Sequence, residues 1–204
     1  FALLAFAVGW LWVRFAGTRP ERSEWVRFFT ANLLVVLLFI PWIGVMVRRL
    51  GVDASYWQGD FHLVEAMRDV AQRFVIGETM RESIAAPLAM VVLLITALLV
   101  ASAWRKDAGL QPLLRFALCW LIVPVAAVTL LATTTPKFNP RYVYLALGGL
   151  VLIWGAGLDW LTSLRRAPAR VAALGMVALL FVPMLWANGN WRFSGDFNKA
   201  QWRE

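Results

Sequence analysis

The chain has 204 residues, of which 61% are hydrophobic and 16% are charged, and its mean hydropathy is +0.66. Soluble domains average about 45–50% apolar and about 25% charged residues, so this composition argues against an ordinary soluble domain. The formal net charge is +8. In a chain this apolar, Lys and Arg at helix ends that meet anionic headgroups explain that charge better than nucleic-acid binding does. The single cysteine, Cys119, excludes an internal disulfide framework.

Six apolar runs follow one another along the chain, and none contains an ionised side chain. In order they are 1–13, 28–47, 83–104, 116–136, 142–158 and 171–191. An α-helix needs about 20 apolar residues to cross the hydrocarbon core of a bilayer, with a range of about 17–25, and the last five runs meet that length. The first run is shorter, and we expect it to be a span inside which this chain begins. The sequence therefore predicts an all-α polytopic transmembrane helix bundle of about six spans, the first truncated, over residues 1–191.

A segment between the second and third runs has a different pattern. In 61–76, FHLVEAMRDVAQRFVI, apolar residues recur mostly at three- and four-residue intervals and polar side chains occupy the other face, which is typical of an amphipathic helix. Asp60 is placed to cap its N-terminus and Gly77 to end it. We expect this helix to lie in the interface on the outer face of the membrane, and packing on the surface of the bundle is the equal alternative.

Alternating crossings sort the linkers into two sets with different densities of basic residues. One set comprises 14–27, 105–115 and 162–170, and the other comprises 48–83, 133–142 and 188–204. Each set carries ten Lys and Arg, within 34 residues in the first set and 63 in the second. Basic residues in short loops favour the cytoplasmic side, so the first set is predicted to be cytoplasmic and the second non-cytoplasmic. Residues 192–204 would then begin a non-cytoplasmic soluble segment.

The densest polar group is the linker that follows the fourth run, TTTPKFNPRYVYLAL. Pro136 and Pro140 push the residues before them, Thr135 and Asn139, toward extended backbone, and Lys137 and Arg141 are expected to project at the membrane surface. A guanidinium grips phosphate oxygens in a bidentate fork and an ammonium adds a mobile charge, so the loop suits the phosphate of a lipid-linked substrate. Interfacial anchoring of the bilayer by the same basic and tyrosine side chains explains the pattern equally well.

Outside that loop the sequence offers few groups for chemistry. His62 is the only histidine and has no cysteine nearby, so these residues build no His/Cys metal site. The acidic residues of 53–82 form no convincing catalytic pair. Only Asp159 approaches a span, whereas pumps and proton-coupled transporters usually hold ionisable residues at membrane depth. No glycine-rich phosphate loop or protease signature is present.

Three stretches together resemble a known enzyme family. TTTPKFNPRYVYLAL is similar to the Pro-Arg-Tyr loop of polytopic glycosyltransferases of the C superfamily, in particular the protein-mannosyltransferase-like and aminoarabinose-transferase-like proteins of glycosyltransferase family 39. PWIGVMVRR followed by YWQGDFHLVEAMRDVAQRFVIGET resembles their outer loop helix. DFNKAQWRE resembles the start of the soluble segment that often follows the last span.

The resemblance implies an inverting glycosyltransferase in a bacterial or archaeal cell membrane. Such an enzyme moves a sugar from a polyprenyl-phosphate donor to a lipid, glycan or protein acceptor on the non-cytoplasmic face. The family's essential acidic residue lies in the first outer loop, which would place it upstream of Phe1 and make this chain the C-terminal part of the membrane domain. By the match to the loop, Arg141 and Lys137 would contact the donor phosphate and Tyr142 would shape the site. No cofactor or nucleic acid is implied, and participation of a divalent metal stays open.

Two non-enzymatic interpretations remain beside this one. A permease or flippase subunit for lipid-linked glycans would use the same loop as a headgroup gate. A non-catalytic membrane scaffold would use it only as an anchor.

Overall fold

The computed structural model describes residues 2–17, 21–52, 61–77, 79–134, 139–164 and 166–193. In these residues the chain is helical and contains no strand, which confirms the predicted all-α class. The helices are α1 (Ala2–Phe15), α2 (Arg22–Val52), α3 (Leu63–Val75), α4 (Glu82–Lys106), α5 (Gln111–Thr134), the 3₁₀ helix η1 (Pro140–Ala146), α6 (Leu147–Ser163) and α7 (Ala167–Phe193).

Five helical segments in the described residues are long and apolar enough to cross a bilayer. They are α2, α4, α5, the continuous η1–α6 segment Pro140–Ser163, and α7. The remaining predicted span, 1–13, corresponds to α1, an apolar helix of 14 residues. The predicted bundle of membrane helices is confirmed, and the chain is an integral membrane protein.

Some predicted boundaries were wrong. The run 28–47 lies within a helix of 31 residues, because polar residues at both ends continue the helix beyond the hydrocarbon-length segment. The run 142–158 was expected to be one α-helix, but its first residues belong to η1, where the proline at 140 begins a tighter turn. The amphipathic helix begins at Leu63 rather than 61. Its N-cap is His62, which makes no side-chain capping bond, and Asp60 lies outside the described residues.

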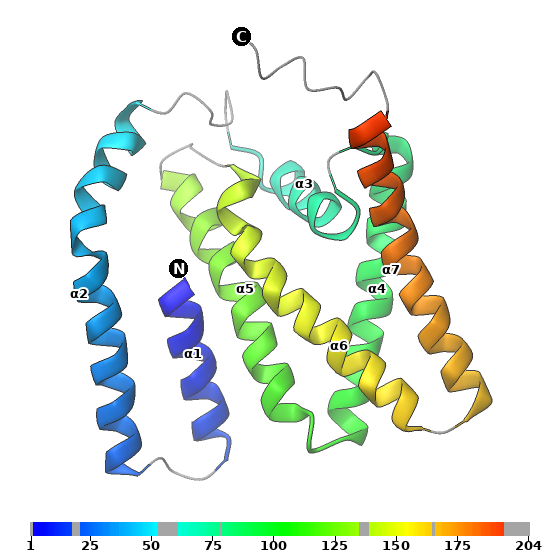
Figure 1. The fold of residues 1–204 in the computed structure, drawn as a ribbon, viewed down its shortest axis with the longest axis horizontal. Coiled ribbons are helices and arrows are strands. Elements are labelled where there is room, and N and C mark those ends of the chain that lie inside the picture. Colours follow the sequence, from blue (N-terminus) through cyan, green and yellow to red (C-terminus); the bar gives the residue numbers. More distant parts are fainter. Residues whose placement is uncertain are drawn as a thin grey trace.

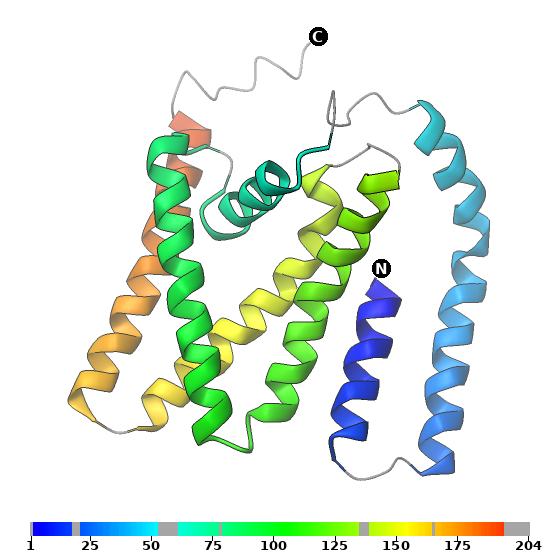
Figure 2. The same cartoon turned by 180° about the vertical axis from the view of Figure 1, so that it is seen from behind.

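The helices run between two ends of the bundle, and α3 lies across one of them, here called the α3 end (Figures 1 and 2). The last turns of α2, α5 and α7 and the first turns of α4 and η1 meet there. At the opposite end lie the last turns of α1, α4 and α6 and the first turns of α2, α5 and α7. This is the alternation that the sequence predicted for its two sets of linkers.

The closest helix packing joins α5 to α6 through glycine. A Cβ placed on Gly149 would lie 2.5 Å from the carbonyl oxygen of Ala117 and 2.6 Å from the backbone nitrogen of Leu121. Only a residue without a side chain permits that approach, as in other membrane helix pairs that meet at small residues. The indole of Trp120 adds a hydrogen bond of 2.9 Å from its Nε1 to the carbonyl oxygen of Leu145 in η1.

A buried polar pair joins α4 to α6 within the apolar region. Thr96 Oγ1 donates a hydrogen bond of 2.8 Å to the carbonyl oxygen of Val92 and accepts one of 2.9 Å from Trp154 Nε1. Thr96 is 7% exposed and Trp154 is 6% exposed. Because there is no water in the hydrocarbon core to form hydrogen bonds, both polar groups need partners within the protein. The hydrogen bond between Trp154 and Thr96 therefore holds the two side chains, and with them α4 and α6, in a fixed relation.

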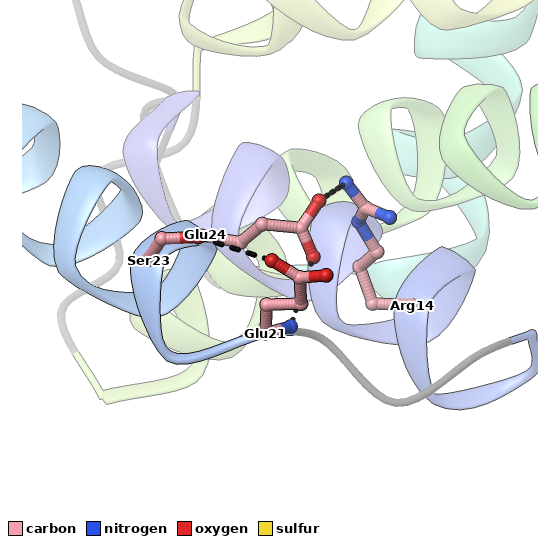
Figure 3. Close-up of polar contacts among 4 residues, drawn as sticks. All are labelled: Arg14, Glu21, Ser23 and Glu24. Carbon is pink, nitrogen blue, oxygen red and sulfur yellow. Dashed lines mark hydrogen bonds and ion pairs between the residues drawn. The ribbon is translucent and has the colours of Figure 1, made fainter.

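At the edge of the bundle, α2 is held through α1 (Figure 1). No residue in its most apolar 18-residue window is buried. Near the opposite end, Trp10 of α1 stacks on Phe28 at 4.2 Å and meets Trp25 edge-on at 5.4 Å. Arg14 also forms an ion pair with Glu24 across the two helices (Figure 3). The apolar surface of α2 is therefore turned outward and is suited to contact with lipid.

The glycine contact predicts a sharp contrast between two alanine substitutions on α6. Gly149→Ala forces a methyl group into the α5 backbone, and we expect it to destabilise the protein by about 1–3 kcal/mol, as overpacking does in other cores. Gly155→Ala is the matched control because nothing lies within 4 Å of its added Cβ. Thermal unfolding of both purified variants in detergent measures the difference. Equal melting temperatures would contradict the close α5–α6 contact.

Candidate functional site

The predicted phosphate-binding loop reaches the described structure at η1. Asn139, before Pro140, has extended backbone at φ −138° and ψ 123°, as the sequence predicted. The side-chain oxygen Oδ1 of Asn139 accepts a hydrogen bond of 3.0 Å from the backbone N–H of Arg141. The backbone carbonyl oxygen of Asn139 accepts a second hydrogen bond, also of 3.0 Å, from the backbone N–H of Tyr142. Asn139 thus caps η1 and fixes the backbone that carries the two predicted site residues.

The side chains of η1 divide between the core and the surface. Val143 and Ala146 are fully buried, whereas Tyr142 and Tyr144 are 43% and 41% exposed. Arg141 is exposed, and η1, which carries it, begins at the α3 end. Arg141 and Tyr142 are thus both exposed neighbours on η1, and their role at a membrane surface stays a prediction. Lys137 and Thr135 lie outside the described residues.

Helix α3 packs on the bundle beside η1. Its buried residues are Ala66, Val70, Phe74 and Val75, and they face α4 and η1. Gly77 ends the helix as predicted, with a φ of +103° and an N–H bonded to the carbonyl oxygen of Gln72 at 3.2 Å. Helix α3 therefore packs on the end of the bundle, and its expected position in the membrane interface stays a prediction.

Two further hydrogen bonds attach the C-terminal side of α3 to α7. Thr79 Oγ1 donates to the carbonyl oxygen of Ala187, and Asn190 Nδ2 donates to the carbonyl oxygen of Thr79 at 3.0 Å. Thr79 is 5% exposed. These bonds satisfy buried polar groups and hold the segment between α3 and α4 against the last helix.

An apolar pocket of about 560 Å³ lies beneath α3. Met67, Val70, Ala71 and Phe74 of α3 form one wall, and the other walls come from α4, α5 and α6. The lining extends along α5 to Thr133, close to the helix end at Thr134. Phe74 also meets the ring of Tyr144 on η1 at 6.3 Å. The pocket therefore reaches the same end of the bundle as Arg141, and its surface is suited to a hydrocarbon chain.

Two of the carboxylates on and beside α3, Asp69 and Glu82, are engaged in ion pairs. Arg73 Nε lies 2.8 Å from Asp69 Oδ1, and Arg68 Nη2 lies 2.9 Å from Glu82 Oε1. In the part of the chain that the structure describes, no three His, Cys, Asp or Glu residues are grouped closely enough to hold a metal ion. The chemistry offered at the α3 end is thus a cation and phenols above an apolar pocket.

A polar cluster at the opposite end was missed by the sequence analysis. The guanidinium of Arg115 lies over the ring of Trp104 at 5.4 Å. Gln111 connects the two, donating to the carbonyl oxygen of Trp104 at 3.0 Å and accepting from Arg115 Nη2 at 3.3 Å. The four-residue spacing of Gln111 and Arg115 indicated that they share a helix face, but nothing in the sequence placed Trp104 beside them.

Comparisons with protein-family models, with curated proteins and with solved structures found no match for this chain.

The attachment of α3 to α7 predicts that the hydroxyl of Thr79 stabilises this end. Thr79→Val removes the hydroxyl that donates a hydrogen bond to the buried carbonyl oxygen of Ala187. We therefore expect the free energy of unfolding to fall by about 1–3 kcal/mol. Thr79→Ser keeps the hydroxyl and should lose less. Thermal unfolding in detergent compares the variants. If valine were as stable as the parent, the hydrogen bond to Ala187 would contribute nothing.

Proposed function

We propose that this chain is part of an integral membrane glycosyltransferase that takes a sugar from a polyprenyl-phosphate donor. The observation that carries the proposal is the exposed Arg141 on a capped, rigid η1 at the end of the bundle that the apolar pocket beneath α3 also reaches. The resemblance of the surrounding loop to family 39 glycosyltransferases supplies the reaction.

A lipid-linked sugar needs two different environments from one protein. Its phosphate needs a fixed cation at the membrane surface, and a guanidinium on a helix that cannot reorient is the stronger choice because it binds two oxygens at once. Its hydrocarbon chain needs an apolar path between helices. The η1 helix and the pocket beneath α3 supply these at the same end of the bundle, since η1 packs against both α3 and α5.

In the proposed reaction, the bond between the sugar's anomeric carbon and the donor phosphate breaks. The acceptor oxygen forms a bond to that carbon from the opposite face, and the acceptor's proton passes to a carboxylate base. Arg141, with Lys137 as a second cation, stabilises negative charge on the departing phosphate, and Tyr142 shapes the site. The base is expected upstream of Phe1, in accordance with the family pattern.

The proposal places the α3 end on the non-cytoplasmic face of a bacterial or archaeal membrane. The α3 end would carry 48–83, 133–142 and the tail 188–204, and the opposite end would carry the more densely basic linkers. Transfer to a lipid, glycan or protein acceptor would then take place outside the cytoplasm.

Thiol labelling in intact cells tests that orientation. In a Cys119→Ala background, His62→Cys sits at the α3 end and Ala108→Cys sits in the turn between α4 and α5, and both positions are exposed. We expect a membrane-impermeant maleimide to label His62→Cys and to label Ala108→Cys only after the cells are broken. The reverse pattern would overturn the proposed sidedness.

Substitution of Arg141 tests the function itself. With the enzyme purified and supplied with polyprenyl-phosphate sugar, Arg141→Gln should lower kcat by about 10²–10³, as loss of a group that stabilises developing charge does elsewhere. Arg192→Gln is the matched control, because Arg192 is an exposed arginine in the last turn of α7 at the same end. Unchanged turnover in Arg141→Gln would remove this residue from the site. Movement of a labelled lipid-linked glycan across proteoliposomes without sugar transfer would favour the flippase.

A further inference from the structure

A second apolar groove lies toward the opposite end of the bundle. Its volume is about 540 Å³, and it is bounded by α1, α4, α5 and α6, with Trp12, Ala97, Leu118 and Ile153 among its lining residues. Trp12 is 42% exposed and Ala97 is exposed, so the groove opens at the side of the bundle, where lipid would be. Its size is within the range of sites that hold small organic ligands.

Away from its end at Trp104 and Arg105, the described lining of this groove is apolar except for Thr96. Thr96 is the hydroxyl in its lining, and that hydroxyl is already bonded to the carbonyl oxygen of Val92 and to Trp154 Nε1. What remains is the hydrocarbon surface of helices that cross the membrane. Such a surface accepts an alkyl chain and disfavours a polar guest.

The mouth of the groove is cationic. Arg105 lies in its lining, and Arg115 stacks over Trp104, which also lines it. Arg115 Nε is buried and has no hydrogen-bond partner among the described residues. Asp107, the nearest acid in the sequence, directs its Oδ1 to the backbone N–H groups of Gly109 and Leu110, at 2.9 and 3.3 Å. Two arginines thus lie at this end of the groove, Arg105 in its lining and Arg115 over the lining ring of Trp104.

Aromatic rings mark the depth of this mouth in the membrane. Trp12 and Trp104 lie with ring centroids 6.1 Å apart across α1 and α4. Indole rings favour the headgroup region of a bilayer, and guanidinium groups at that level attract anionic lipid. We therefore expect the groove to lie beside the acyl chains of the lipid whose headgroup is level with these rings.

We propose that this groove binds one anionic phospholipid of the leaflet opposite the α3 end. The phosphate lies on Arg105 and Arg115, and one acyl chain follows the groove between α4 and α5. The proposed phosphate position differs from that of the donor, because η1, which carries Arg141, begins at the other end of the bundle, although Leu93, Leu121 and Leu150 line both cavities. The inference does not depend on the glycosyltransferase proposal.

Native mass spectrometry of the protein in mild detergent tests the phosphate contact. With phosphatidylglycerol, we expect one lipid to be retained, and with phosphatidylcholine we expect markedly less. Arg105→Gln and Arg115→Gln should each weaken phosphatidylglycerol binding about fivefold, the value of one basic residue beside an anionic lipid. Arg170→Gln is the matched control, since Arg170 is exposed in the first turn of α7 at the same end and should leave binding unchanged.

A second pair of variants tests the groove without changing any charge. Ala97→Phe fills the groove from an exposed position and should abolish retention of the lipid. Ala178→Phe adds the same ring to an exposed position on α7 that lies outside the groove. It should retain the lipid, and both proteins should remain folded because neither alanine is buried.

Three outcomes would overturn the proposal. The first is equal retention of phosphatidylcholine and phosphatidylglycerol, and the second is equal binding by the groove variants and their controls. The third is displacement of the bound phospholipid by a polyprenyl phosphate in the parent protein but not in Arg141→Gln. That result would show that the hydrocarbon chain of the donor fills the groove. Loss of sugar transfer in Arg141→Gln with phospholipid retained would instead leave both proposals standing.

Discussion

The approach of α6 to the backbone of α5 at Gly149 is the constraint from which the rest of the arrangement follows. With no side chain at that position, the two helices meet closely enough for Trp120 to bond the carbonyl oxygen of Leu145 in η1. That bond fixes the start of the η1–α6 segment on α5. The helix carrying Arg141 is thus positioned by packing in the apolar region, and not by its own exposed side chains.

The pocket beneath α3 and the groove toward the opposite end, together called the two grooves, both result from this helix packing. Helix α6 contacts both α4 and α5 more extensively than those two contact each other, so the space between α4 and α5 is filled at its base by α6 side chains such as Leu150. Leu93, Leu121 and Leu150 line both grooves. Helix α3 covers one groove, and the Trp12–Trp104 pair borders the other. Both cavities therefore have mainly apolar walls, and the two proposals place one lipid chain in each.

Much of the fold was predictable from the sequence because hydrocarbon thickness sets the length of a spanning helix and the runs at 83–104 and 171–191 meet it directly. Gly77 was equally readable, since few other residues accept its positive φ. The η1 turn was missed, because an apolar run does not distinguish a 3₁₀ helix from an α-helix. The cluster of Arg115 with Trp104 was missed for a different reason. Its members come from two helices, and their meeting depends on a packing angle that a linear pattern does not contain.

Four of the described carboxylates make contacts within the protein. Glu24, Asp69 and Glu82 are each paired with an arginine, and Asp107 accepts two backbone N–H groups. Those oxygens are occupied in holding helices and turns together. Arg141 of η1, by contrast, is exposed, and among the described residues its backbone N–H donates to Asn139 Oδ1. In the proposed enzyme, Arg141 and the pocket beneath α3 would hold the lipid phosphate and its chain, and the proton would pass to the acidic residue that the family pattern places in the first outer loop.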